Sequence, residues 1–187
     1  LRQCLQVFCS SNGDVTTFHQ ISQALTMEGR PVSPTRFHNS VHNAPAGYWS
    51  IATESQTQST SLTAYKDSFS AGLLETAVQL NASDNQAQKD CLLVCYDETP
   101  PAAFSSLIET KDELACALRF SLKPNSESMA QIILTIDASQ AETVDLLSIH
   151  NAQSPVLILL DAIANKRYGN ICLPYFEHSL NVRLKEV

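Results

Sequence analysis

Two neighbouring charged residues, Lys66 and Asp67, stand where a strand-like segment passes into a helical one. Residues 59–77 read STSLTAYKDSFSAGLLETA, a β-like run followed by an amphipathic helix. Such a corner is a common mount for a nucleophile, because a helix N-terminus favours an anion. Lys66 would act as a base or nucleophile if its pKa were depressed in a partly buried corner. A structural salt bridge with Asp67 or a residue of a partner is the simpler interpretation.

Two other pairs of residues that can bind metals are each spaced four residues apart, and both have simpler structural explanations. His38 and His42 would share one face of a helix, as zinc ligands do, but no glutamate follows His38 and no third ligand is near. Cys91 and Cys95 would point to one buried face of a strand. Their spacing differs from the two-residue gap of a zinc knuckle, so we interpret them as structural thiols.

Asp97 and Glu98 are a candidate acid/base pair, although adjacent residues at a strand end usually point apart. The sequence contains no GxGxxG, GxxxxGK[ST] or GxSxG pattern, and its five glycines leave little room for a phosphate-binding loop. We therefore expect neither a cofactor nor a metal ion.

The composition is that of an acidic globular chain. Its 187 residues are 44% apolar and 17% charged, which is enough for one domain with a core. The net charge of −7, without any basic run, argues against nucleic acid or an anionic membrane surface as the main partner. The longest apolar stretch, PVLILL, is too short to span a bilayer. We interpret the six cysteines as reduced and, because LRQCLQ does not resemble a signal peptide, expect a cytoplasmic protein.

Alternating strand-like and helical segments predict one α/β domain over residues 1–187, with a mixed or parallel sheet. Helices are predicted after Asp14, on both sides of APAG within 37–54, around Phe69–Leu80, and at 141–150 and 156–164. Strands are predicted at 4–9, 60–65, 90–98, 114–122 and 130–137, with a charged edge strand at 180–187.

Residues 33–51, SPTRFHNSVHNAPAGYWSI, resemble a segment of the β-ketoacyl synthases, condensing enzymes of the thiolase-like fold. The family pattern S-P … V/I-x-N-x-x-A-G-x-x-[ST]-I is matched by Ser33, Pro34, Val41, Asn43, Ala46, Gly47, Ser50 and Ile51. TSLTAY is similar to the strand before the active cysteine, and DCLLVCYDE to a strand ending in a conserved glutamate, here Glu98. The resemblance covers about 4–122 and implies half of a thiolase-like fold, with 123–187 divergent.

The catalytic residues of that family have no counterpart here. A gapless alignment places Lys66 where the acyl-accepting cysteine stands, and a shift of one residue places Asp67 there. Neither residue can form a thioester. The two active-site histidines belong to a second half-domain that the remaining residues do not resemble. The resemblance therefore implies that the chain by itself is not an enzyme.

A synthase-like half without its nucleophile resembles the chain-length factors of type II polyketide systems, silent partners of an active ketosynthase. It is more similar still to the short, N-terminal-domain-only proteins of bacterial aryl polyene clusters. The resemblance implies a heterodimer in which one strand pairs across the subunit interface through Thr60, Ser61, Leu62, Thr63, Ala64 and Tyr65. It also implies that the partner's acyl tunnel is lined or closed by Phe37, His38, Val41 and His42.

Because the chain is acidic, we do not expect it to be the main binding surface for an acyl carrier protein. The surface patch that binds the carrier protein is expected on the synthase partner. Two alternatives remain open. The first is a stand-alone thioester-processing enzyme that uses Lys66, and the second is a homodimeric acyl-binding scaffold.

Overall fold

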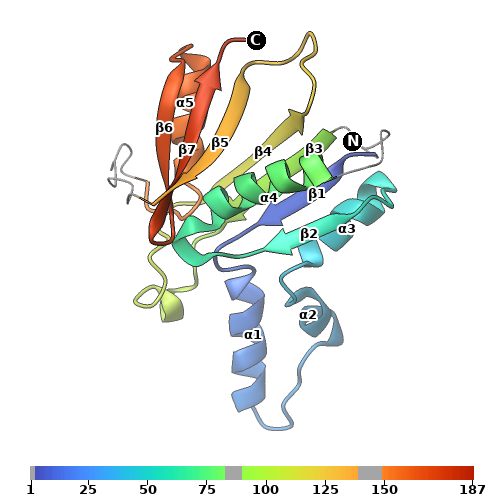
Figure 1. The fold of residues 1–187 in the computed structure, drawn as a ribbon. Helices are drawn as coiled ribbons and strands as arrows, with labels where there is room; N and C mark the ends of the chain where they lie inside the picture. The colour runs from blue at the N-terminus through green and yellow to red at the C-terminus, as the bar shows by residue number, and fades with distance from the viewer. Residues whose placement is uncertain (1–2, 83–89, 139–148) are drawn as a thin grey trace.

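A computed structural model of the chain describes residues 3–82, 90–138 and 149–187, which form two β-sheets (Figure 1). Sheet A is mixed and has the strand order β2–β1–β3–β4, in which β4 is antiparallel to β3 and the other pairs are parallel. Its strands are β1 (Leu5–Cys9), β2 (Ser59–Leu62), β3 (Asp90–Asp97) and β4 (Leu114–Ser121). Sheet B is antiparallel with the order β5–β7–β6, formed by β5 (Gln131–Asp137), β6 (Gly169–Tyr175) and β7 (His178–Lys185).

The helices divide into a packed pair and an outlying group. Helices α4 (Ser68–Ala82) and α5 (Pro155–Ala164) contact each other and β6, and α4 also packs on β1 and β3. Helices α1 (Val15–Thr26), α2 (Pro34–Asn39) and α3 (Ala44–Thr53) lie between β1 and β2 in the chain. The described residues also include two short 3-10 helices, η1 (Tyr65–Asp67) and η2 (Ala102–Phe104). The predicted α/β class with a mixed sheet is confirmed.

The hydrophobic core joins both sheets to the packed helix pair. Its fully buried side chains include Leu93 of β3, Leu73 of α4, Leu159 of α5 and Leu180 of β7, and β1 and β6 contribute others. Gly72 permits the close approach of α4 to sheet A, because a Cβ there would lie 2.8 Å from Cys9 Sγ. Strand β3 is buried over most of its length, as the near-continuous apolar run DCLLVC predicts.

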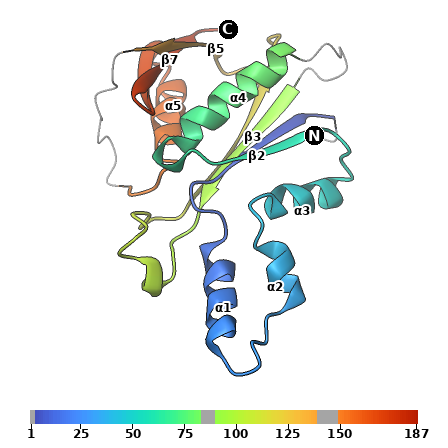
Figure 2. The ribbon, with the colours of Figure 1, turned by 60° about the horizontal axis from the view of Figure 1, so that its bottom comes forward.

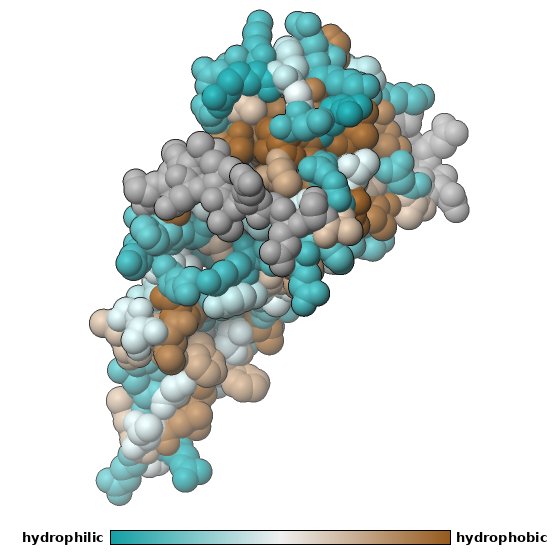
Figure 3. All heavy atoms as spheres, turned by 60° about the vertical axis from the view of Figure 1, so that its left-hand side comes forward, coloured by the Kyte–Doolittle hydropathy of each residue, from teal (hydrophilic) through white to brown (hydrophobic). Residues whose placement is uncertain are grey.

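Residues 15–53, here called the arm, leave the end of β1; α1 and α2 project away from the sheets, and α3 returns to lie beside β1 and β2 (Figures 1 and 2). The arm helices bury only Val15, Ala24 and Ala46. Figure 3 shows apolar side chains exposed at intervals along the arm. The large apolar side chains that it exposes are Phe18, Leu25, Met27, Phe37, Val41, Tyr48 and Ile51. The arm therefore has almost no core of its own.

Several element predictions were wrong in detail. APAG begins α3 rather than interrupting a helical region, since a proline in the first helical turn costs no hydrogen bond. Strand β2 ends at Leu62, and β6 was not predicted. The predicted edge strand 180–187 is the central strand β7, whose Leu180, Val182 and Leu184 face the core.

Most of the predicted helix 141–150 lies outside the described residues. Among the helices that the structure does describe, none has the length and apolar character required to cross a membrane.

Candidate functional site

The corner between β2 and α4 is formed by η1, and its strained residue is Tyr65. Tyr65 has a left-handed φ of 53° and leaves its side chain 63% exposed. A strained residue at a sharp strand-to-helix turn is the geometry in which hydrolases mount a nucleophile. This position directly precedes the two residues that the alignment places at the family's cysteine. The corner thus has the shape of a nucleophile mount, and tyrosine, lysine and aspartate occupy it.

Lys66 is held in an ion pair. Its Nζ lies 2.7 Å from Glu109 Oε2, and 55% of its side chain is exposed. The hydrogen bond to Glu109 raises the pKa of Lys66 above its ordinary value, against a smaller opposing effect of desolvation. The premise of a partly buried lysine with a depressed pKa is therefore wrong, because the ammonium is stabilised rather than destabilised. Lys66 thus forms a salt bridge, but with Glu109 of the same chain, whereas Asp67 or a residue of a partner was predicted.

The other polar groups of the corner are also engaged. Asp67 Oδ2 accepts a hydrogen bond of 3.1 Å from the backbone N–H of Phe176, in the turn between β6 and β7. The Ser68 hydroxyl donates to the carbonyl of Tyr65 at 2.8 Å and accepts from the N–H of Ala64 at 3.0 Å. These contacts tie the start of α4 to sheet B and hold the corner in one conformation.

The cysteines nearest to α4 are buried structural thiols. Cys9 and Cys95 are paired in register on β1 and β3, and neither is accessible to solvent. A hydrogen bond with Cys95, then burial, raises the pKa of the Cys9 thiol. Burial raises the pKa of Cys91 to about 11. The Cys9 and Cys91 thiols stay protonated at neutral pH, which disfavours a nucleophilic role for either of them. The structural interpretation of Cys91 and Cys95 agrees with their burial.

Asp97 and Glu98 differ in burial, although both line the cavity described below. Asp97 is 3% exposed, whereas Glu98 is exposed. The carboxylate of Asp97 accepts hydrogen bonds from the Ser10 hydroxyl at 2.8 Å, the backbone N–H of Ser11 at 2.9 Å and the Gln153 side-chain amide at 2.7 Å. All these donors are neutral groups, so the charge of this buried carboxylate is hydrogen-bonded without a cationic partner among the described residues.

Gln153 is a buried site residue that sequence reasoning missed. It precedes α5 and links Asp97 to that helix, while the neighbouring Asn151 donates to the backbone carbonyls of Asp97 at 3.3 Å and Asp112 at 2.8 Å. The only sequence signal was an aspartate ending an apolar strand. The partner of that aspartate lies 56 residues away and no local pattern indicates it.

The two histidines do not share a helix. Helix α2 ends at Asn39, so His38 lies on it while His42 lies in the turn before α3. His42 Nε2 is 3.2 Å from the carbonyl oxygen of Ser10. Phe37, His38 and Val41 are exposed on the arm, where they remain candidates to line a partner's tunnel. In the described part of the chain, no cluster of three or more His, Cys, Asp or Glu residues is arranged to bind a metal.

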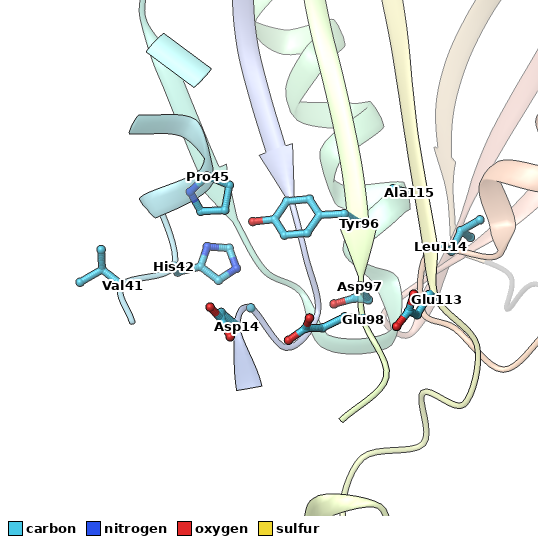
Figure 4. A pocket seen from close by; sticks show the side chains of 11 residues that line it. Asp14, Val41, His42, Pro45, Tyr96, Asp97, Glu98, Glu113, Leu114 and Ala115 are labelled. Carbon is cyan, nitrogen blue, oxygen red and sulfur yellow. The ribbon is translucent and has the colours of Figure 1, made fainter. Parts of the chain in front are cut away.

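A cavity of about 550 Å³ lies at the base of the arm, between the start of α1, the turn before α3 and the ends of β3 and β4 (Figure 4). We call it the acidic pocket; it is lined by Gly13, Asp14, Val41, His42, Pro45, Tyr96, Asp97, Glu98, Glu113, Leu114 and Ala115. Burial, and then the charge of Asp97, raise the pKa of Tyr96 to about 12, so its phenol is neutral. The pocket has an apolar wall and a rim of carboxylates.

The predicted interface strand has an open edge. Among the described residues, β2 pairs with β1 on one side only. The Thr60 hydroxyl accepts from the Gln79 amide at 2.7 Å, and the Thr63 hydroxyl donates to the carbonyl of Ser11 at 3.1 Å. The Thr60 contact holds β2 against α4, whereas Thr63, Ala64 and Tyr65 of the predicted interface strand follow β2, with Tyr65 in η1. No other strand of the described residues pairs with the outer edge of β2.

Solved structures share this fold, and two of them are described here. The first is described as the ketosynthase ApeO in complex with its chain length factor ApeC from Xenorhabdus doucetiae, with 22% identity and a TM-score of 0.74 over 98% of this chain and 70% of that one. The second is the ishigamide ketosynthase/chain length factor, with 12% identity and a TM-score of 0.68 over 98% of this chain and 73% of that one. At these identities the likeness concerns the fold. No curated protein sequence matches the chain.

Sequence comparison identifies the family of this chain. The family described as beta-ketoacyl synthase, N-terminal domain, matches residues 2–175, which is nearly the whole chain and extends well beyond the predicted limit of 122. The match agrees with the mixed α/β architecture of the structure. The chain therefore belongs to the β-ketoacyl synthase N-terminal domain family, and its thiolase-like fold is that of the family.

Proposed function

We propose that the chain is a catalytically inactive, chain-length-factor-like subunit that pairs with an active ketosynthase and helps to wall its acyl tunnel. The observation that carries the proposal is the corner at Tyr65, Lys66 and Asp67. It keeps the shape of a nucleophile mount without a thiol, and the ion pair with Glu109 keeps Lys66 protonated and thus non-nucleophilic. Condensation would therefore take place on the partner.

The exposed apolar surface of the arm supports a protein partner. Monomeric proteins rarely leave this many large apolar side chains uncovered on one projecting segment. Phe37 on α2 and Val41 in the turn that follows it are exposed, so both would be free to contact a partner's surface. The arm returns directly into β2, so a partner strand paired with β2 would also meet the arm.

The similar solved structures support the same partner class, since both are described as ketosynthases with chain length factors. In the proposed complex the active ketosynthase would receive the acyl carrier protein, because this subunit is itself acidic. We place the complex in polyketide biosynthesis of the aryl polyene type, and in the cytoplasm.

Co-expression of the tagged chain with a ketosynthase from the same organism tests the proposal. We expect a stable 1:1 complex in gel filtration, with condensing activity that depends on the ketosynthase cysteine and survives Lys66→Ala in this chain. A chain that stays monomeric beside its ketosynthase would contradict the proposal. A homodimer that excludes the ketosynthase would favour the scaffold alternative. Thioester turnover by the isolated chain, lost in Lys66→Ala, would favour the enzyme alternative.

A further inference from the structure

We propose that the acidic pocket receives an arginine or lysine side chain of the ketosynthase partner and thereby fixes the arm on that subunit. The inference rests on the proposed function, because it assumes that partner. It adds a specific recognition site, away from the β2 edge, together with the chemistry of its occupant.

The charge of the pocket calls for a cation. Asp14 at the start of α1, Glu98 after β3 and Glu113 before β4 bring three carboxylates to one rim, and no lysine or arginine is among the described residues that line the cavity. Asp97 adds a buried charge that meets only neutral donors there. Because all four charges have one sign, the cavity has a negative potential that favours a cationic group from outside the chain.

The shape of the pocket suits a long side chain with a charged end. The ring of Tyr96 and the side chain of Val41 lie on its wall, and Figure 4 shows the phenol of Tyr96 directed toward His42. An arginine or lysine can place its aliphatic stem along such a wall while its head stays at the carboxylates. The face of the Tyr96 ring would add a cation–π contact with a guanidinium.

The place of the pocket favours a partner protein over a free small cation. Val41 and His42 belong both to the pocket and to the arm, so a protein that covers the apolar arm also covers the mouth of the pocket. An acidic recess beside an apolar surface is a typical arrangement for an interface, in which burial supplies affinity and charge sets the register.

Binding measurements on the purified pair test this inference. The double variant Glu98→Gln and Glu113→Gln removes two rim charges without changing side-chain size. We expect about a tenfold weaker heterodimer at low salt, with a shallower dependence of the dissociation constant on ionic strength. The control Glu127→Gln and Glu186→Gln removes two exposed charges outside the pocket, and we expect less than about a twofold change.

Charge reversal identifies the occupant. Glu98→Lys with Glu113→Lys should prevent binding at low salt, and one Arg→Glu or Lys→Glu variant of the ketosynthase should restore it. Unchanged affinity and salt dependence in the neutral double variant would overturn the inference while leaving the heterodimer intact. Binding of agmatine to the isolated chain that requires Glu98 and Glu113, without any effect on the heterodimer, would also overturn it. A wild-type chain that does not bind the ketosynthase would contradict both proposals.

Discussion

The region around α4 and the arm both carry large apolar side chains, which are buried in the first region and exposed in the second. In α4 and the sheets, apolar side chains meet one another, so that Phe69, Leu73 and Leu93 are almost completely buried. In the arm, Phe37 and Ile51 are 67% and 75% exposed. Burial is what makes an apolar side chain stabilising, so the first region supports its own fold, whereas the arm leaves apolar surface that the proposed partner would cover. The same chain thus separates folding from recognition.

The largest effect is expected from a core truncation. Leu93→Ala removes a fully buried side chain beneath α4, and we expect a loss of about 2–5 kcal/mol in the free energy of unfolding. The matched arm variant is Ile51→Ala, for which we expect a change within about 0.5 kcal/mol. Urea denaturation of both variants measures the difference. Equal losses would mean that the arm contributes to the same core.

The next effect concerns Asp97, which joins the base of the arm to the core. Asp97→Ala leaves the Ser10, Ser11 and Gln153 donors without their acceptor, and we expect a loss of about 2–3 kcal/mol in the free energy of unfolding. Amide hydrogen exchange in α1 should also become faster, because the turn that begins the arm is released. Glu98→Ala is the control, since this adjacent carboxylate is exposed and its removal should leave stability nearly unchanged. A similar loss in both variants would disprove the role assigned to Asp97.

A glycine-to-alanine substitution can be compared in the two regions, at Gly72 in α4 and at Gly47 in the arm. In Gly72→Ala the new methyl would lie 2.8 Å from Cys9 Sγ and 3.0 Å from Leu93 Cδ1, and we expect a loss of about 1–3 kcal/mol in the free energy of unfolding. Gly47 lies in α3, where a methyl group on its Cα would have no neighbour within 4 Å. Gly47→Ala should therefore stabilise the chain by about 0.5–1 kcal/mol through helix propensity. Thermal unfolding would show shifts of opposite sign, and shifts of one sign would refute the comparison.

The smallest effect on stability is expected for a substitution in the arm. The same substitution should weaken assembly with the ketosynthase more than it changes stability. Phe37→Ser should change the free energy of unfolding by less than about 0.5 kcal/mol, because the ring is already in solvent. It should weaken the ketosynthase complex about tenfold or more, as measured by titration calorimetry. Leu122→Ser is the control, an exposed apolar side chain just after the far end of β4. Loss of assembly in the control variant would show that the arm has no special part in binding.

Local patterns predicted much of the fold. The apolar run of β3 and the Asp14 cap of α1, whose side chain accepts from the N–H of Thr17 at 2.7 Å, were readable because their determinants lie within a few residues. The central position of β7 in sheet B could not be predicted from the sequence. Its charges suggested an edge strand, whereas its alternate leucines and valine pack against helices from elsewhere in the chain. Central or edge position depends on which strands pair, and pairing is a long-range property.

For the candidate site, the sequence by itself determined that no thiol stands at the start of α4, since the corner contains tyrosine, lysine and aspartate whichever of the two alignments is chosen. Only the tertiary structure decided what those residues do. The pKa of Lys66 is raised because Glu109 is brought beside it, and the carboxylate of Asp97 is buried because the turn after β1 and Gln153 enclose it. Residue type is local, whereas the surroundings that set charge and exposure come from distant segments of the chain.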